Sequence, residues 1–219
     1  MSRSDLSASI PIADLWYSRD AGQWANALER YWLFIRPENI QLERAIDPLD
    51  IDELRRLDPE GWYQFLREKY FRWKYTAPNR YATTTHALDR NARKQGGLAA
   101  LVAVRDQLLA VKSEDVAGAV LVAMKIPGLG TAGASGLLAL LYPRAFGTVD
   151  QFVVKALRSI PDLPEAGSVA AMNPEALLPG DAVVLIGAMR RQAAALAAAL
   201  RTDIWTPRAI DKVLWTYGR

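Results

Sequence analysis

The sequence MKIPGLGTAGASGLLALLYPRAFGTVDQFVVKAL occupies residues 124–157, and two apolar segments in it flank the turn Pro127-Gly128-Leu129-Gly130. Glycine tolerates positive φ and leaves backbone amides accessible, so we expect a tight turn between two helices. The amides and the dipole at the N-terminus of the second helix favour an anion. A DNA phosphate fits such a site and would be held there without base readout.

The residues after the turn strengthen this interpretation. Ala134 follows Gly130 by four positions, where a small side chain lets the second helix approach the first, and Leu137 and Leu138 supply its apolar face. The alternative is an ordinary turn between packed helices, because Pro-Gly-x-Gly alone is a weak signal. The residues expected to contact DNA phosphate are Gly128, Leu129, Gly130, Thr131 and Ala132.

The rest of the chain predicts an all-α fold, because it shows little of the alternation that marks strands. Helix start signals stand at Asp58-Pro59, Ser113, Asp150 and Thr206-Pro207. Residues 181–200 form an alanine-rich helical segment. Residues 76–97 are polar and contain Pro78 and Gly96-Gly97, so they predict a loop, with at most a short helix near residues 87–94.

Composition narrows the possible chemistry. The 219 residues contain no cysteine and one histidine, His86. Thiol nucleophiles, zinc-thiolate sites, cysteine-held iron–sulfur clusters and multi-histidine metal sites are therefore excluded. Residues 1–12 lack the apolar core of a signal peptide, and the longest apolar run, residues 182–189, is too short to span a bilayer. We expect a soluble cytoplasmic protein.

Charge is unevenly distributed along the chain. The net charge is +3, but residues 60–112 carry ten Lys/Arg and four Asp/Glu. A basic block just before the turn can mark a surface that binds a polyanion. The alternative, a solvated helix surface, is favoured on charge alone.

Residues 145–157, AFGTVDQFVVKAL, together with the turn, resemble the helix-hairpin-helix DNA glycosylase superfamily, which includes the endonuclease III, adenine glycosylase and 8-oxoguanine glycosylase branches. Asp150 lies 20 residues beyond Gly130, which matches the endonuclease III spacing. The resemblance implies that Asp150 is the catalytic carboxylate. The alternative is that Asp150 only caps the helix that follows it.

The resemblance also implies an architecture and an ion. A helical barrel lobe over residues 55–145 would end in the hairpin, and residues 1–54 with 146–219 would form a second lobe, with Asp150 at the cleft between them. In relatives, hairpin carbonyls hold K⁺ or Na⁺, and the matching carbonyls are those of Met124, Ile126 and Leu129. No iron–sulfur cluster is expected, because the chain has no cysteine.

The chain departs from this pattern at one position. Bifunctional relatives carry a lysine two residues after the second hairpin glycine, where this chain has Ala132. The departure predicts a monofunctional enzyme that uses water, or an inactive protein. Lys125 and Lys155 are candidate displaced nucleophiles, although a helix-end cation and a phosphate contact are the simpler interpretations.

A base pocket is expected from the aromatic residues of 62–75, WYQFLREKYFRWKY. Trp62, Tyr70 and Trp73 share one helical face and could stack a base, beside interleaved cations. The alternative is an amphipathic core helix with a basic solvent side.

The resemblance implies a glycosylase that acts on duplex DNA in base-excision repair, and we expect it to be monomeric and to act away from membranes. The expected substrate is an oxidised purine such as 8-oxoguanine, and a modified base of phage DNA is the alternative. A non-catalytic helix-hairpin-helix DNA-binding protein is the competing class, favoured by Ala132.

Overall fold

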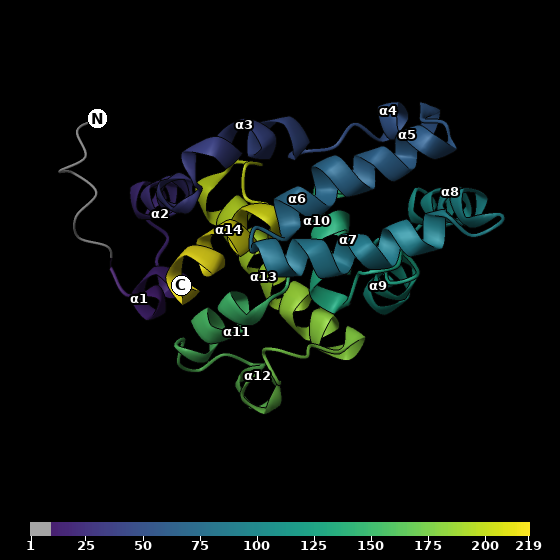
Figure 1. Cartoon of the computed structure of the whole chain (residues 1–219). Helices are drawn as coiled ribbons and strands as arrows, with labels where there is room; N and C mark the ends of the chain where they lie inside the picture. Colours follow the sequence, from purple (N-terminus) through teal and green to yellow (C-terminus); the bar gives the residue numbers. More distant parts are fainter. Residues whose placement is uncertain (1–9) are drawn as a thin grey trace.

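The computed structural model describes residues 10–219, and these residues form helices without any strand, which confirms the all-α prediction. Residues 1–9, part of the predicted second lobe and of the segment tested for a signal peptide, lie outside the described residues. The helices, labelled in Figure 1, are α1 (Ile12–Tyr17), α2 (Ala21–Phe34), α3 (Pro37–Ile46), α4 (Ile51–Arg56), α5 (Pro59–Gln64), the π-helical segment η2 (Phe65–Tyr70), α6 (Phe71–Lys74), α7 (Pro78–Ala92), α8 (Gly97–Leu108), α9 (Val116–Ala123), α10 (Thr131–Leu141), α11 (Gln151–Arg158), α12 (Ala166–Ala171), α13 (Pro179–Leu200) and α14 (Pro207–Gly218).

Most of the predicted helix starts are present. The Asp58 carboxylate accepts a hydrogen bond from the Gly61 amide at 2.7 Å, and the Thr206 hydroxyl accepts one from the Ala209 amide at 3.1 Å. The predicted cap at Ser113 is wrong, because Asp115 accepts from the Gly118 amide and starts α9 two residues later. Side-chain capping of the first free amides therefore sets these helix boundaries.

The predicted loop over residues 76–97 is wrong, because α7 covers most of it. Pro78 occupies the first turn of α7, where a missing amide costs nothing. The hydroxyls of Thr83, Thr84 and Thr85 each donate to the carbonyl four residues earlier, so these polar side chains are satisfied inside the helix. Their polarity is thus compatible with an exposed helix.

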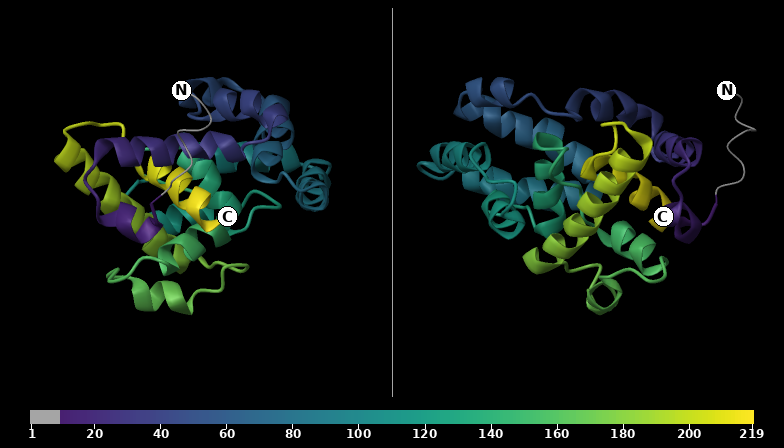
Figure 2. Two further views of the ribbon diagram at one scale, coloured as in Figure 1. Left: turned by 90° about the vertical axis from the view of Figure 1, so that its left-hand side faces the viewer. Right: turned by 180° about the vertical axis from the view of Figure 1, so that it is seen from behind.

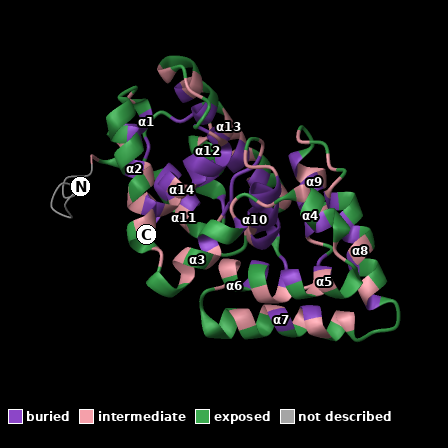
Figure 3. Cartoon of the chain, turned by 90° about the horizontal axis from the view of Figure 1, so that it is seen from above, coloured by how far each residue is buried: buried purple, intermediate pink, exposed green. Residues whose placement is uncertain are grey.

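The helices gather on two sides of α10 (Figures 1 and 2). One side holds α4, α5, α7, α8 and α9, and the other holds α1, α2, α11, α12 and α14. Between them α10 is buried over nearly its whole length (Figure 3). Continuous burial of a helix means that it packs on several neighbours at once. The lobe boundaries at 55–145 remain a prediction.

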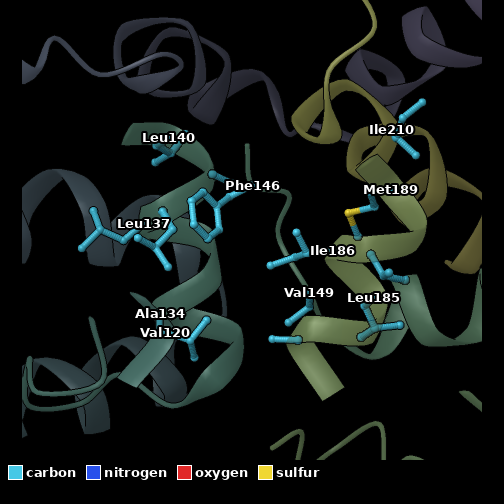
Figure 4. Close-up of a cluster of buried hydrophobic side chains, with 14 of the residues drawn as sticks. Val120, Ala134, Leu137, Leu140, Phe146, Val149, Leu185, Ile186, Met189 and Ile210 are labelled. Carbon is cyan, nitrogen blue, oxygen red and sulfur yellow. The ribbon is translucent and has the colours of Figure 1, made fainter. Parts of the chain in front are cut away.

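The core joins these two sides. Val120, Ala134 and Leu137 of α9 and α10 lie in one buried cluster with Phe146 and with Ile186 of α13 (Figure 4). Helix α13 is long and apolar enough to cross a membrane by length and composition. It packs, however, against α9 and α14, and its residues Leu185, Ile186 and Met189 are fully buried. Core packing therefore accounts for the apolar side chains on the buried face of α13.

Candidate functional site

A cavity of about 840 Å³ lies where the start of α10, the end of α6, Asp150 and α14 meet. This volume falls in the range of sites that bind small molecules. The residues from these elements that line it include Trp73, Lys74, Gly128, Gly130, Thr131, Ala132, Gly133, Thr148, Asp150, Arg208, Asp211 and Trp215. The cavity thus brings together most of the predicted phosphate contacts and Asp150.

The turn between α9 and α10, here called the hairpin (residues 124–130), presents free amides to this cavity. Gly128 has φ +94°, and Gly130 is extended and precedes the first residue of α10. Among the described residues no acceptor is bonded to the amides of residues 130–133. Such amides at a helix N-terminus form an anion-binding surface. Leu129, by contrast, is buried with its side chain in the core.

The two hairpin glycines have separable roles. A Cβ on Gly128 would lie 2.6 Å from the Thr84 carbonyl oxygen, whereas one on Gly130 would meet nothing within 4 Å. We expect Gly128→Ala to lower the free energy of unfolding by about 2 kcal/mol or more, from the positive φ and the clash. Gly130→Ala should cost less than about 1 kcal/mol. Denaturant unfolding of both variants checks this, and equal losses would contradict it.

The hairpin carbonyls differ in their availability as ligands of the implied K⁺ or Na⁺. The Ile126 carbonyl already accepts from the Leu129 amide at 3.1 Å. The Met124 and Leu129 carbonyls accept no hydrogen bond from any described residue, so their lone pairs are available. Hard oxygen donors of this kind suit an alkali cation. Met124 and Leu129 are therefore the freest donors of this set.

Asp150 is both a helix cap and a cavity residue. Its Oδ1 accepts from the Phe152 amide at 2.9 Å and from the Val153 amide at 3.1 Å, which confirms that Asp150 starts α11. Its Oδ2 makes no hydrogen bond or ion pair with the residues that the structure describes. One oxygen stabilises the helix while the other is available in the cavity. The two interpretations of Asp150 are thus compatible.

The segment before Asp150 is fixed by three helices. The Val149 amide donates to the Ser135 hydroxyl of α10 at 3.0 Å, and the Thr148 amide donates to the Asp211 carboxylate of α14 at 2.6 Å. A Cβ on Gly147 would lie 2.3 Å from the Met189 sulfur of α13 and 2.8 Å from the Pro207 carbonyl oxygen, and because the second contact is with backbone, only glycine fits there. These contacts set the position of the Asp150 carboxylate relative to the start of α10.

Of the three aromatic residues predicted to form the base pocket, one lines the cavity. Trp62 is buried, stacks on Phe65 and donates to the Leu101 carbonyl, and Tyr70 is buried and donates to the Gly133 carbonyl. Neither lines the cavity, whereas Trp73 does. The π-helical segment η2 explains why Trp73 faces another way than the regular period predicts. A π-helical turn contains more residues than an α-helical turn, so the residues after η2 are rotated out of the α-helical phase.

A buried ion cluster forms the wall beside Trp73. Arg208 of α14 contacts the carboxylates of Glu43 at 3.1 Å, Asp47 at 3.0 Å and Asp211 at 2.7 Å. Its guanidinium carbon lies 5.3 Å from the centre of the Trp73 ring, and the Trp73 indole N–H donates to Glu43. Because buried charges require such partners, the cluster fixes α3, α6 and α14 together.

The cluster perturbs its own carboxyl groups. Burial opposes ionisation of Asp47, but Arg208 and Lys212 outweigh it and hold the pKa of Asp47 below its ordinary value. Burial raises the pKa of Asp211 to about 6, against the opposing effects of Arg208 and the Thr148 amide. The cavity wall therefore contains a carboxyl whose pKa is raised by burial, and perturbed groups of this kind are typical of functional sites.

The candidate lysines do not reach the cavity. The Lys125 amine donates to the Gln107 side chain at 2.7 Å and the Lys155 amine to the Arg219 carbonyl at 3.3 Å, and neither residue lines the cavity. Lys74, one of the cations interleaved with the aromatic residues of 62–75, does line it. Lys74 follows η2, whose π-helical turns shift the phase of the residues after it.

Much of the predicted basic block is a paired helix surface. Arg67 contacts Glu68 and Asp89, and Arg72 contacts Glu68 at 3.0 Å. The buried Arg105 donates to the Leu57 carbonyl. Within residues 60–112, Lys74 and Arg80 are the cations that line the cavity in the described structure. The simpler interpretation, a solvated helix surface, thus holds for Arg67 and Arg72, whereas Arg105 is buried.

The cavity combines free helix amides, a carboxylate with an unpaired oxygen and a lysine, against a rigid buried wall. Such a site can hold an anion, stabilise developing positive charge and supply an amine. Comparisons of the chain with protein families, with curated proteins and with solved structures found no match.

Proposed function

We propose that this protein is a DNA N-glycosylase that removes a damaged or modified base, with Asp150 as its catalytic carboxylate. One observation carries the proposal: the free amides of residues 130–133 and the unpaired Asp150 oxygen line the same cavity. A phosphate on the amides would anchor the DNA backbone. Asp150 would then face the sugar of an extruded nucleotide.

The chemistry follows from the charge that develops during bond cleavage. Breaking an N-glycosidic bond leaves positive charge on the deoxyribose, and a nearby carboxylate stabilises it and can activate water. Ala132 supplies no amine, so water is the proposed nucleophile of base removal. An oxidised purine such as 8-oxoguanine is the first substrate to test, and a modified phage base is the second.

The remaining parts of the proposal concern partners. Duplex DNA is the proposed partner of a monomeric, cytoplasmic protein. The hairpin carbonyls of Met124, Ile126 and Leu129 would hold K⁺ or Na⁺, which would add positive charge near the same phosphate. If no base is ever released, the competing proposal is a DNA-binding protein without catalysis, for which Ala132 remains the main support.

The test is base release from duplexes that each carry one modified base. The panel contains oxidised and alkylated purines, deaminated bases and the modified pyrimidines of phage DNA, and the products are free base and an alkali-labile site. We expect release from at least one duplex. Salt-dependent DNA binding without release from any duplex would replace the glycosylase with the binding protein.

Gly130→Ala tests the phosphate contact separately from folding. Its methyl group would enter open space at the start of α10, where the proposed phosphate must approach the backbone. We expect the DNA dissociation constant to rise about 10-fold, equivalent to about 1.4 kcal/mol. Fluorescence anisotropy with labelled duplex measures this change. Unchanged affinity in the folded variant would place the phosphate elsewhere.

A further inference from the structure

Lys74 is the one lysine among the residues that line the cavity in the described structure. The other cations there are arginines, which stay protonated and do not act as nucleophiles. An amine in a cavity beside a carboxylate has two ordinary uses: it anchors an anion, or it attacks a carbonyl carbon. The surroundings of Lys74 distinguish these uses.

The fold holds the Lys74 side chain in a defined place. Lys74 is the last residue of α6, and its ammonium lies 6.0 Å from the centre of the Trp73 ring. Its Cδ packs on α10 at Gly136, where an added Cβ would be only 3.3 Å away. Lys74 therefore reaches the cavity from the wall that carries the hairpin amides.

The Lys74 amine has no fixed partner. Within residues 10–219 its Nζ forms neither a hydrogen bond nor an ion pair, although its side chain is half-buried. Structural lysines in such positions are normally paired. Lys125 and Lys155 illustrate the contrast, because each amine is bonded to a protein oxygen and neither residue lines the cavity.

Electrostatics favours the reactive form of this amine. Burial lowers the pKa of the Lys74 ammonium below its ordinary value. The carboxylates of Asp150 and Asp211, which line the same cavity, oppose that shift. A lowered pKa increases the neutral fraction at neutral pH, and only the neutral amine is nucleophilic.

We propose that Lys74 attacks the C1′ aldehyde of the abasic deoxyribose and so gives the protein a lyase activity that Ala132 alone would exclude. This inference rests on the proposed function, because base removal supplies the aldehyde. The neutral Lys74 Nζ forms a bond to C1′, and the aldehyde oxygen leaves as water with one proton from Nζ and one from solvent, which gives a protonated imine. Asp150 takes the C2′ proton, and the C3′–oxygen bond breaks to expel the 3′ phosphate.

The test uses a duplex that already contains one abasic site, so it does not depend on which base is removed. Sodium borohydride supplies a hydride that reduces the imine to a stable secondary amine. We expect a covalent adduct between protein and DNA on a denaturing gel, and peptide mapping by mass spectrometry should place it on Lys74. Mapping on the wild type requires no variant to fold.

Substitutions of Lys74 distinguish nucleophilic attack by its amine from anion binding by its charge. Lys74→Arg and Lys74→Gln are expected to lower adduct formation at least 100-fold, and Lys74→Arg should keep the DNA dissociation constant within about 3-fold, since its charge remains. Lys125→Arg and Lys155→Arg are the matched controls and should form the adduct normally. Thermal unfolding confirms that each variant is folded.

Several results would overturn the proposal: no adduct with the wild type, an adduct on another lysine, or an undiminished adduct in folded Lys74→Arg. Base release without an adduct would leave the glycosylase intact and remove only the role of Lys74. An adduct without base release from any duplex would keep Lys74 as an abasic-site lyase and remove the glycosylase.

Discussion

Asp150→Asn is expected to lower the single-turnover rate of base release about 10³-fold. Asparagine has no charge to stabilise the positive deoxyribose and cannot accept a proton from water. The rate is measured by quantifying free base with protein in excess over the duplex that gives release. DNA affinity should stay equal or rise slightly, because the substitution removes a negative charge near the proposed phosphate.

The geometry of the cap allows this substitution to remove the charge of Asp150 while it keeps the hydrogen bonds that cap α11. Asp150 caps α11 through Oδ1 alone, and asparagine retains that oxygen. The free energy of unfolding should therefore change by less than about 0.5 kcal/mol. Asp115→Asn is the matched control, because Asp115 also caps a helix but does not line the cavity. It should leave the rate of base release unchanged.

Two outcomes would contradict the assignment of Asp150 as the catalytic carboxylate. A folded Asp150→Asn variant with the wild-type rate would show that the carboxylate is only a cap. A wild type that binds DNA but releases no base, with or without the substitution, would support the DNA-binding protein instead. The rate, the affinity and the stability must therefore be measured on the same preparations.

Local features of this fold could be predicted from the sequence because their causes lie within a few residues. Asp58, Asp150 and Thr206 bond to amides two or three positions ahead, so each signal is contained in its own helix start. The error over α7 has a local cause as well. Polar composition predicts a loop, but the threonine hydroxyls there are satisfied by the helix itself.

The cavity wall could not be predicted in the same way, because it is built by long-range packing. Arg208 meets Asp47 and Glu43 across 161 and 165 residues of chain, and only the helical pair with Asp211 is visible in the sequence. The position of Lys74 depends on a different effect. Lys74 is one of the cations interleaved in residues 62–75, but the π-helical segment changes the phase of the helix, so a regular period does not show which of these cations faces the cavity.

Arg208→Met is expected to lower the free energy of unfolding by about 3–5 kcal/mol, because it leaves buried carboxylates without their cation. Arg208, Glu43, Asp47 and Asp211 have side chains that are 3–6% exposed, so water cannot replace the lost contacts. Denaturant unfolding measures the loss. Base release should fall too, since Trp73 and the segment before Asp150 are bonded to the same cluster.

Arg144→Met is the matched control, because the Arg144–Asp203 pair is exposed and should contribute no more than about 1 kcal/mol.

The pH dependence of the unfolding free energy supplies a second check. In the wild type, the lowered pKa of Asp47 adds to the free energy of unfolding at pH values above the ordinary pKa of an aspartate. This contribution is lost only as the pH falls through the lower pKa that Asp47 has in the folded protein. In Arg208→Met the carboxyl groups that have lost their cation have raised pKa values instead. The loss of unfolding free energy relative to the wild type should therefore be largest near about pH 8 and should shrink toward about pH 5, as these groups take up protons. A loss that matches Arg144→Met, or one that grows as the pH falls, would mean that Arg208 does not neutralise this cluster and that the cavity wall is held by apolar packing alone.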